Sequence, residues 1–388
     1  MMVPFSYNLR SLWVRRSATL LTVFGIGATV AVVAGVLALQ QGFEHMYTEN
    51  GRDDVLVFMR PGADNEGNSV FQVDRAEILQ KTLPEVLRNQ AGEPMASLEL
   101  YSGVRRFKLD GGETNVPIRG VQQMTFEIRS EELTITSGRI FAQGSDEILI
   151  GSKLLGRIRG AEIDDVIVIN TTPFTIVGVL DSAGSFASEI WGDLDRMQAA
   201  LNRVGPSRVI AMVAPDADVA SIRERLLHDK QTPAKVLTER EYLSAMTKAL
   251  SGALIFLSSF LGVVMGIAAV FTSTNTMLSA ISSRTREIGI LLACGFRPLP
   301  IFLSFLFESA VLGLVGGLVG CLMVLPINGI ETGTTNFKTF TEVAFAFQVT
   351  PYVMAVAVAF ALVLGLIGGA LPAWKASRLT PTEALRRV

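Results

Sequence analysis

Four long segments of this 388-residue chain carry almost no charge, and this feature constrains the fold more than any other. They cover residues 17–40, 249–283, 300–325 and 351–371, and the third contains a single acid, Glu308. About 20 apolar residues cross a hydrocarbon bilayer. Each segment must be helical, because lipid offers no hydrogen-bond partner to an unpaired backbone. The first segment is too long for the apolar core of a cleaved signal peptide. The sequence therefore predicts four membrane-spanning helices.

The block between the first two segments, residues 44–248, has a different composition. It holds 23 Lys and Arg and 31 Asp and Glu in 205 positions, whereas the rest of the chain holds 16 of the 70 charges. Such a division excludes a simple soluble enzyme, a disordered protein and a nucleic-acid binder with a basic face. Both cysteines, Cys294 and Cys321, lie outside this block, so a secreted disulfide scaffold is excluded as well.

The charges that flank the apolar segments predict the orientation of the chain. The N-terminal flank, the loop after the second segment and the C-terminal tail together carry ten Lys or Arg against two acids. The block 44–248 has a net charge of −8. Positive loops stay in the cytoplasm. We therefore expect a multi-pass protein of the cell inner membrane with both termini cytoplasmic and the large block in the periplasm.

Two β-α-β patterns lie at the two ends of the large block. Strands are predicted at 54–59, 96–109, 208–213 and 234–238, and amphipathic helices at 74–89 and 219–227. Such units favour one ferredoxin-like layer made from both ends of the block. The middle, about 110–200, is rich in predicted strands, at 147–150, 166–170 and 174–179, and is interpreted as an inserted β-rich subdomain. The fold class is an α+β membrane protein.

No catalytic or metal site is predicted from the sequence. The chain has no G-x-x-x-x-G-K-[ST] loop to hold nucleotide phosphates, and no G-x-G-x-x-G followed by a suitable acid. His45 and His228 are far apart and have no neighbouring cysteine, which argues against zinc. Carboxylate pairs in the block are interpreted as solvated surface.

Glu308 is the only acid within a predicted span, and an acid in a bilayer is costly unless it has a function or a partner. Three interpretations are open. Glu308 lies near the interface and pairs with an arginine of the preceding loop, it transmits motion between loop and span, or it relays protons. A proton relay would need a partner acid or histidine, and the other predicted spans contain none.

Glycines in the third segment form two overlapping G-x-x-x-G spacings, which let helices approach closely. They are Gly313, Gly316, Gly317 and Gly320. Packing within the chain and packing against another subunit are equally consistent with this pattern.

The loop after the second segment, residues 284–298, begins with charge and becomes apolar. Ile288, Leu291 and Leu292 would share one side of a short helix that ends at Gly295 before Pro298. By composition alone it is a helix lying in the membrane interface or a docking element for a partner.

Several motifs together resemble the FtsX-like permease family. They are Arg286-Glu287-Ile288-Gly289 with Ala293 and Gly295, Phe305 with Glu308 and the glycine run to Gly320, Gly369 with Pro372-Ala373 and the tail Thr380–Arg386, Asn8-Leu9-Arg10 before the first segment, and Ser137–Arg139, Glu147–Gly151 and Phe174–Val179 in the block. The resemblance covers nearly the whole chain.

The resemblance implies the permease subunit of a MacB-like, type VII ABC transporter. In that family the loop between the second and third helices is a coupling helix, which docks into an ATPase and transmits its motion to the periplasm. The implied coupling residues are Arg284, Arg286, Glu287, Ile288, Gly289, Ala293 and Gly295, with Glu308 as support. The chain itself would bind no cofactor, because a separate ATPase polypeptide would bind ATP and Mg²⁺.

The resemblance also implies a partner set and a function. The expected partners are an ATPase dimer, a second permease copy or a paralogue, membrane lipid, and a periplasmic cargo protein or adaptor, with no nucleic acid. The expected function is export or extraction of a lipoprotein, lipid or peptide, and the alternative is regulation of a periplasmic cell-wall hydrolase or sensor. An unrelated membrane enzyme or secondary transporter is a third possibility.

The predicted domain boundaries follow from these assignments. They are an interfacial helix at 1–16, spans at 17–41, 249–283, 299–326 and 351–372, the periplasmic domain at 42–248, the coupling loop at 284–298, a short periplasmic loop at 327–350 and a cytoplasmic tail at 373–388.

Overall fold

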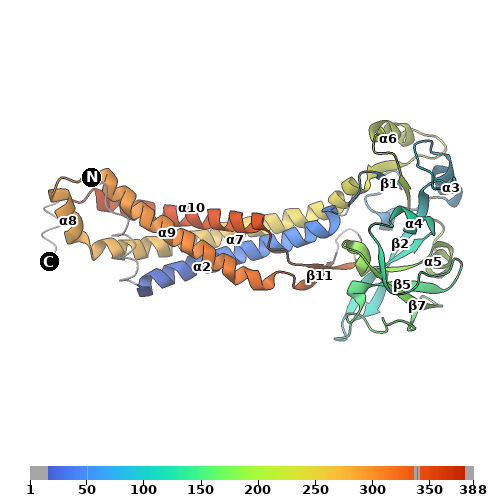
Figure 1. Ribbon diagram of the computed structural model, residues 1–388, viewed down its shortest axis with the longest axis horizontal. Coiled ribbons are helices and arrows are strands. Elements are labelled where there is room, and N and C mark those ends of the chain that lie inside the picture. The colour runs from blue at the N-terminus through green and yellow to red at the C-terminus, as the bar shows by residue number, and fades with distance from the viewer. Residues whose placement is uncertain (1–15, 50, 336–338, 340, 381–388) are drawn as a thin grey trace. The chain divides into compact units, whose positions relative to one another are not determined.

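The computed structural model divides into two compact units (Figure 1). The residues that it describes are 16–49, 51–335, 339 and 341–380. The helical unit comprises Met1–Gly42, Ser251–Ile330 and Ala346–Val388. The sheet unit comprises Phe43–Leu250 and Glu331–Phe345. The interfacial helix predicted at 1–16 lies outside the described residues except for Arg16, and so does the tail from residue 381.

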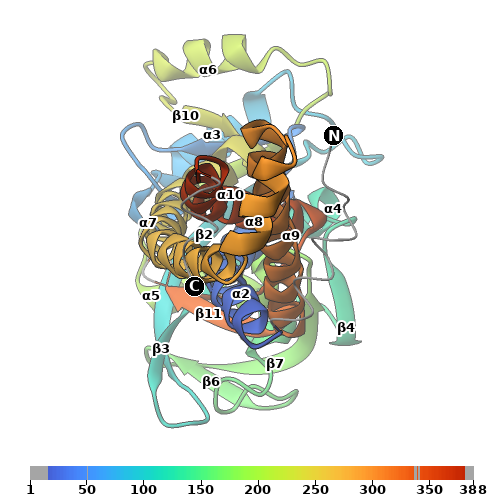
Figure 2. The same cartoon turned by 90° about the vertical axis from the view of Figure 1, so that its left-hand side faces the viewer.

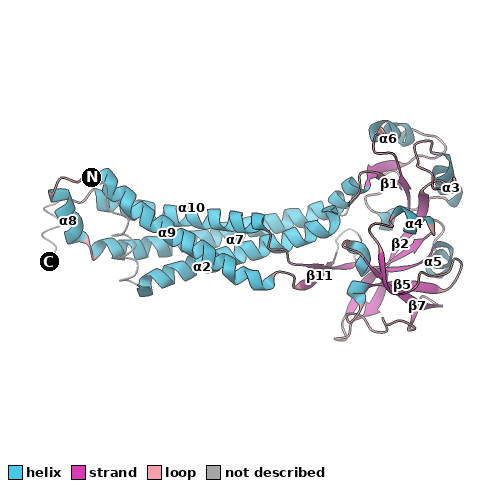
Figure 3. Cartoon of the chain, in the orientation of Figure 1, coloured by secondary structure: helices cyan, strands magenta, loops and turns pink. Residues whose placement is uncertain are grey.

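Within the described residues, four long helices are apolar enough to cross a membrane, which confirms the predicted spans. They are α2 (Arg16–Glu44), α7 (Glu239–Ser282), α9 (Pro298–Val324) and α10 (Pro351–Ser377). A short helix, α8 (Thr285–Ala293), connects α7 to α9. Figure 3 shows these helices in cyan and the strands of the sheet unit in magenta. A π-helical turn, η1 (His45–Glu49), follows α2.

Two helices extend beyond the limits of the predicted spans. α7 begins at Glu239, ten residues before the predicted span, because its first turns are charged and lie in the sheet unit. α10 continues through Pro372 to Ser377. A proline within a helix leaves the carbonyl four residues earlier without its amide partner. Here that carbonyl, Gly368 O, accepts a hydrogen bond from Thr274 Oγ1 of α7 at 2.9 Å, which compensates for the missing bond.

One half of the sheet unit is the predicted ferredoxin-like layer. Its strands are β1 (Val55–Met59), β2 (Ala96–Phe107), β9 (Arg208–Met212) and β10 (Lys235–Thr238). They are antiparallel in the order β10-β1-β9-β2, and the crossovers are α3 (Val73–Thr82) and α6 (Val219–Leu227). This order and these crossovers confirm the layer made from both ends of the block.

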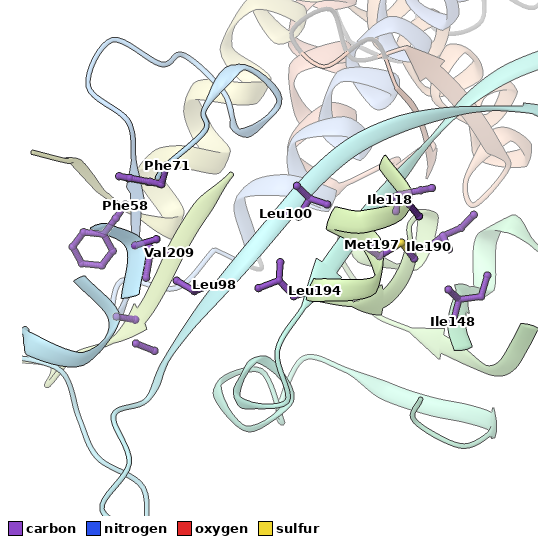
Figure 4. Packing of buried hydrophobic residues seen from close by; sticks show 14 of the residues in the cluster. Phe58, Phe71, Leu98, Leu100, Ile118, Ile148, Ile190, Leu194, Met197 and Val209 are labelled. Atoms are coloured by element: carbon purple, nitrogen blue, oxygen red, sulfur yellow. The ribbon is translucent and has the colours of Figure 1, made fainter. Parts of the chain in front are cut away.

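The inserted half continues the same sheet. Its strands are β3 (Glu113–Val121), β4 (Thr134–Gly138), β5 (Glu147–Gly151), β6 (Val166–Ile169), β7 (Thr172–Asp181) and β8 (Ile190–Asp193). Its short helices are α4 (Met124–Ile128), α5 (Leu194–Leu201) and the 3₁₀ turns η3 (Ser152–Leu154) and η4 (Ser185–Ser188). The long strand β2 pairs with β9 at one end and β3 along the other, so the two halves share one sheet. One buried cluster runs through both, from Phe58 to Ile148 (Figure 4).

Three local predictions were wrong. The helix predicted at 74–89 ends at Thr82, because Leu83 precedes Pro84 and is extended. The strands predicted at 166–170 and 174–179 leave Thr171-Thr172-Pro173 as the turn between them. Instead, the turn is Asn170-Thr171, where Asn170 adopts a φ of 52°, and Pro173 lies within β7. Residues 327–350 are not a plain loop: η5 (Leu325–Ile327) is followed by a hairpin of β11 (Glu331–Thr335) and β12 (Glu342–Ala346).

Candidate functional site: helix α8 and the buried ionic cluster

Helix α8 is held by the ends of three long helices. Its inward residue, Ile288, is 2% exposed. Ile288 belongs to a buried cluster with Met277 and Ile281 of α7, Ile301 and Phe305 of α9, and Ala373 and Ala376 of α10. Gly295, with a φ of +87°, follows the helix and permits the turn toward α9. Figure 2 looks onto the end of the helical unit that carries α8.

The outward face of α8 carries the charged residues of the predicted coupling set. Arg286, Glu287, Ala293 and Gly295 are exposed, whereas Ile288 and Gly289 are buried within the helical unit. The two buried residues therefore position α8, and contact with another protein would use the exposed ones. Ile290, 48% exposed, is part of this face and was missed from the sequence. Its spacing of four from Arg286 would have placed it there.

Glu308 of α9 lies beside Arg284, the residue that precedes α8. Arg284 Nη1 donates to Glu308 Oε2 at 3.5 Å, and the two side chains are 12% and 5% exposed. The structure thus places Glu308 against a loop arginine, as the first of the three interpretations expects. The pair links α9 directly to the start of α8.

The four glycines of α9 face two different helices of the same chain. A Cβ on Gly313 would lie 2.7 Å from Ala361 O, and one on Gly317 would lie 2.8 Å from Ala361 Cβ, so this pair faces α10. A Cβ on Gly316 would lie 2.9 Å from Ile26 Cβ, and one on Gly320 would lie 2.7 Å from Gly27 O, so this pair faces α2. Both spacings are used for packing within the chain.

A buried ionic cluster occupies the sheet unit, and sequence reasoning missed it. It consists of Arg119, Arg129 and Arg208 with Glu66, Glu99, Glu189 and Glu239, whose side chains are at most 6% exposed. Arg119 contacts Glu66, Glu99 and Glu189 at 2.8, 3.0 and 2.7 Å. The available signal was a charged residue within an otherwise apolar strand, as at Glu99 and Arg119.

Glu99 is the centre of this cluster. Its Oε2 accepts from Arg208 Nε at 2.8 Å and from Arg119 Nη1 at 3.0 Å. Burial alone would raise the pKa of Glu99, but Arg208 and Arg119 outweigh burial and hold the pKa at about 2. Charges buried at this depth require such pairing, since removal of one partner leaves the other without compensation.

The cluster binds the first turn of α7. Arg129, the residue after α4, donates to Glu239 Oε1 at 2.5 Å, and the Glu66 amide donates to Tyr242 Oη at 3.4 Å. Both α7 residues line a cavity of about 30 Å³, as do Tyr47 and Val343. The chain segments after α2, at the start of α7 and between α9 and α10 therefore meet at one place within the sheet unit.

The hairpin β11–β12 has its own ionic contact with the sheet. Glu342 contacts Lys108 Nζ at 2.7 Å and Arg157 Nη2 at 3.0 Å, and it accepts from Thr114 Oγ1 at 2.5 Å. Tyr101 Oη lies 2.9 Å from Thr341 Oγ1. These contacts hold the hairpin against β2 and β3.

Two family models match the chain. The model described as the MacB-like periplasmic core domain matches residues 19–228, which is more than half of the chain, and the FtsX-like permease C-terminal model matches residues 258–381. The chain belongs to the MacB/FtsX-like ABC permease family. The MacB-like match contains α2 and nearly all of the sheet, and the FtsX-like match contains α8, Glu308 and the glycines of α9.

Curated relatives of the MacB/FtsX-like family extend beyond this chain. The pyoverdine export ATP-binding/permease protein PvdT of Pseudomonas fluorescens (strain Pf0-1) is 27% identical over 97% of this chain and 58% of its own length. The macrolide export ATP-binding/permease protein MacB of Hahella chejuensis is 25% identical over 99% of this chain and 60% of its own length. The chain thus spans less than two thirds of these relatives.

Two solved structures are similar to parts of the chain. The periplasmic region of MacB from Actinobacillus actinomycetemcomitans is 13% identical, with a TM-score of 0.36 over 49% of this chain and 90% of that one. The extracellular domain of the transporter YknZ from Gram-positive bacteria is 15% identical, with a TM-score of 0.35 over 47% of this chain and 98% of that one.

Proposed function

We propose that this chain couples ATP hydrolysis by a separate ABC ATPase to a conformational change of the sheet unit, which exports or extracts a lipoprotein, lipid or peptide. The observation that carries the proposal is α8, a short helix whose inward side is locked by three spans and whose outward side is charged. ATP and Mg²⁺ would be bound by the ATPase. Relatives named for pyoverdine and macrolide export support the direction of transport.

The first step of the mechanism takes place at α8. Arg286 and Glu287 would contact the ATPase through charge, and Ile290 and Ala293 would fill its groove. Closure of the ATPase dimer would displace α8. Ile288 is packed against α7, α9 and α10, and Arg284 is paired with Glu308. Because these contacts are direct, a displacement of α8 would also displace the ends of the three spans.

The second step takes place along α7. This helix is continuous from Glu239 to Ser282, and its first turn is bonded to Arg129 in the ionic cluster. The cluster contains residues of both halves of the sheet, so α7 acts on both. ATP hydrolysis would thus change the conformation of the sheet unit, and no cargo would need to cross the bilayer through this chain. Such transmission needs elements with two packing arrangements.

The positive flanks support an orientation in which α8 is cytoplasmic and the sheet unit is periplasmic. A second copy of the chain, or a paralogue, would complete the permease, because the ATPase works as a dimer. A periplasmic cargo protein or adaptor and membrane lipid are the remaining partners.

Co-purification tests the proposal. The full chain is isolated from native membranes in mild detergent, and ATP turnover and associated chains are measured for the wild type and the Glu287→Arg variant. The control is Glu224→Arg, an equal charge reversal at an exposed position of α6 in the sheet unit. We expect an ATPase to accompany the wild type and the control but not Glu287→Arg. Absence of an ATPase from the wild type in several detergents contradicts the proposal.

A further inference from the structure

One face of α10 changes from aliphatic to aromatic to basic toward the C-terminal end of the helix. Its exposed residues recur every three or four positions and therefore lie on one side of the helix: Val363, Ile367, Leu371, Trp374, Lys375 and Arg378. The first four of them are 47–61% exposed. The opposite side, which includes Ala373 and Ala376, is buried against other helices. We call the exposed series from Val363 to Arg378 the outer stripe of α10.

The spacing of two aromatic residues along α10 indicates where the hydrocarbon of a bilayer would end. Tyr352, 66% exposed, lies near the start of the helix, and 22 residues separate it from Trp374. At the rise of an α-helix the two residues are about 33 Å apart along the axis, and the hydrocarbon core is about 30 Å thick. Tyr and Trp favour the two interfaces of a bilayer. Leu371 would therefore contact acyl chains, whereas Lys375 and Arg378 would reach the headgroups.

The two cations of the outer stripe have no acidic partner within the described part of the chain. Neither Lys375 nor Arg378 forms an ion pair there, whereas Glu308, an acid of the same helical unit, is paired with Arg284. Arg378 Cζ instead lies 4.4 Å from the centroid of the Trp374 ring, in a cation–π contact. The indole N–H of Trp374 has no acceptor among the described residues. An indole, an ammonium and a guanidinium donor thus share one exposed surface.

Two cations at the C-terminal end of a helix also compensate its dipole, and the dipole alone would explain their charge. It does not explain why Arg378 stacks on Trp374 instead of donating to one of the last carbonyls of α10. Phosphate oxygens accept strong hydrogen bonds from guanidinium and ammonium groups, and anionic lipids carry such a phosphate. We propose that Trp374, Lys375 and Arg378 bind the phosphate headgroup of an anionic membrane lipid on the α8 side of the bilayer, with Leu371 against its acyl chain.

The proposed lipid site lies on the reverse side of the turn on which α8 packs. Ala373 and Ala376 belong to the same turn of α10, are 0% exposed, and share a buried cluster with Ile288 of α8. Figure 2 shows α8 beside this end of α10. Lys375 and Arg378 are three positions apart, so they repel each other as neighbours on the helix surface. A bound phosphate offsets this repulsion and stabilises the turn, and the lipid thus supports α8 without contacting it.

The fluorescence of Trp374 tests the site in the full chain. The chain, purified in an uncharged detergent, is titrated with dibrominated phosphatidylglycerol, which is anionic, or with dibrominated phosphatidylcholine, which has no net charge. Bromine quenches an indole that it contacts. The contribution of Trp374 is the difference from the Trp374→Phe variant, which retains Trp13 and Trp191. We expect phosphatidylglycerol to quench Trp374 at a concentration at least fivefold lower than phosphatidylcholine.

Two pairs of charge removals separate a site from general attraction to a positive surface. Lys375→Gln with Arg378→Gln should reduce the preference for phosphatidylglycerol to less than twofold. The matched control is Arg16→Gln with Arg297→Gln, which removes two exposed positive charges from other helix ends of the helical unit and should leave the preference intact. Equal losses from both pairs would overturn the site. Failure of both lipids to quench Trp374 would show that another molecule, such as a second copy of the chain, covers the ring, and would also overturn it.

A soluble phosphate ester is the other source of the same headgroup chemistry. Glycerol 1-phosphate at millimolar concentration is added to the chain that has bound dibrominated phosphatidylglycerol. We expect no recovery of Trp374 fluorescence, because the contact of Leu371 with an acyl chain favours the lipid. Full recovery would show that the site takes a free phosphate ester and would overturn the assignment to a lipid.

Hydrogen exchange tests the support of α8. The amides of Thr285–Ala293 are compared in bilayer discs of phosphatidylglycerol and of phosphatidylcholine. We expect exchange at least twofold slower in phosphatidylglycerol for the wild type, and equal exchange in both lipids for Lys375→Gln with Arg378→Gln. Equal exchange in the wild type would overturn the link between the lipid and α8. None of these measurements needs an ATPase, so a failure of the lipid site is distinguishable from a failure of the proposed function.

Discussion

Arg129 and Glu239 are 110 residues apart in the sequence, and their side chains meet at 2.5 Å in the core of the sheet unit. Both are almost fully buried. Arg129 ends a short helix of the inserted half, and Glu239 begins the helix that leads to α8. This contact joins the longest helix of the chain to a network that also contains the ferredoxin-like layer. The account of function depends on this continuity.

The same substitution at two glutamates of the sheet unit should have opposite effects on stability. The pKa of Glu99 is about 2, well below its ordinary 4.5, so its ionised form stabilises the fold above pH 4.5 and this contribution disappears as the pH falls from 4.5 through 2. At pH 7 we expect Glu99→Gln to lower the free energy of unfolding by about 3 kcal/mol, at 1.36 kcal/mol per pKa unit.

Glu132, by contrast, has a raised pKa, because burial opposes ionisation more than Arg129 favours it. Its ionised form therefore costs stability at neutral pH, and the cost falls as the pH drops through its pKa. We expect Glu132→Gln to leave the free energy of unfolding of the full chain in detergent unchanged or higher. Equal losses from Glu99→Gln and Glu132→Gln, measured by chemical denaturation at pH 7, would contradict the opposite pKa shifts of the two carboxyl groups.

Alanine at two glycines should distinguish the close backbone packing of α9 against α2 from the open surroundings of Gly252 in α7. A Cβ at Gly320 would lie 2.7 Å from Gly27 O, so we expect Gly320→Ala to destabilise the chain by about 1–3 kcal/mol. Gly252 of α7 has nothing within 4 Å of its ideal Cβ, and alanine there gains helix propensity of up to about 1 kcal/mol. Thermal unfolding of the two variants is the measurement, and a Gly320→Ala protein as stable as Gly252→Ala would contradict the packing.

A double-mutant cycle should show a favourable interaction energy between the buried side chains of Arg284 and Glu308. Removing one charge leaves the other without its partner, and such changes cost about 3–5 kcal/mol in buried sites. We expect Glu308→Gln alone to lower stability and ATP turnover more than Arg284→Gln with Glu308→Gln together. A double variant no better than the single one, with activity that follows the proton gradient, would instead support a proton relay at Glu308.

The hairpin β11–β12 should detach from the sheet at acidic pH. Burial would raise the pKa of Glu342, but its hydrogen bonds from Lys108 and Thr114 lower it below the ordinary 4.5. Its ionised form thus stabilises docking above about pH 4.5, and docking weakens as the pH falls through the lowered pKa. We expect lower protection of the amides of Glu331–Thr335 and Glu342–Ala346, relative to the intrinsic exchange rate at each pH, below pH 4.5, and at pH 7 in Glu342→Gln. The exposed Glu331→Gln should exchange like the wild type.

The sequence predicted the elements that depend on local composition. Four spans and two β-α-β units follow from apolar runs and from periodicity, and the structure confirms both. The first turns of α7 were not predicted, because Glu239–Lys248 is charged and a search for apolar spans ends where the helix enters the sheet unit. The helix predicted at 74–89 was too long because Leu83, Val86 and Leu87 keep a helical spacing beyond the proline that stops it.

The sequence did not predict the ionic cluster, for a different reason. Its members come from strands and turns between Glu66 and Glu239, and only the sheet order brings them together. Likewise, the glycine spacings of α9 predicted close packing but not the partner helix of each pair. The assignment of α8 as a coupling helix stays a prediction, based on a motif and on the exposed charges that the structure places on its outward face.

The most direct test of the account is a distance measurement during ATP hydrolysis. Spin labels at Phe256 of α7 and Leu318 of α9, both exposed, would be placed in the complex with its ATPase, after replacement of Cys294 and Cys321. The account predicts that the distance changes when ATP is trapped, and that the change is absent with Glu287→Arg. An unchanged distance in a complex that hydrolyses ATP, or the same change with Glu287→Arg, would contradict the claim that α8 and α7 carry the work of the ATPase.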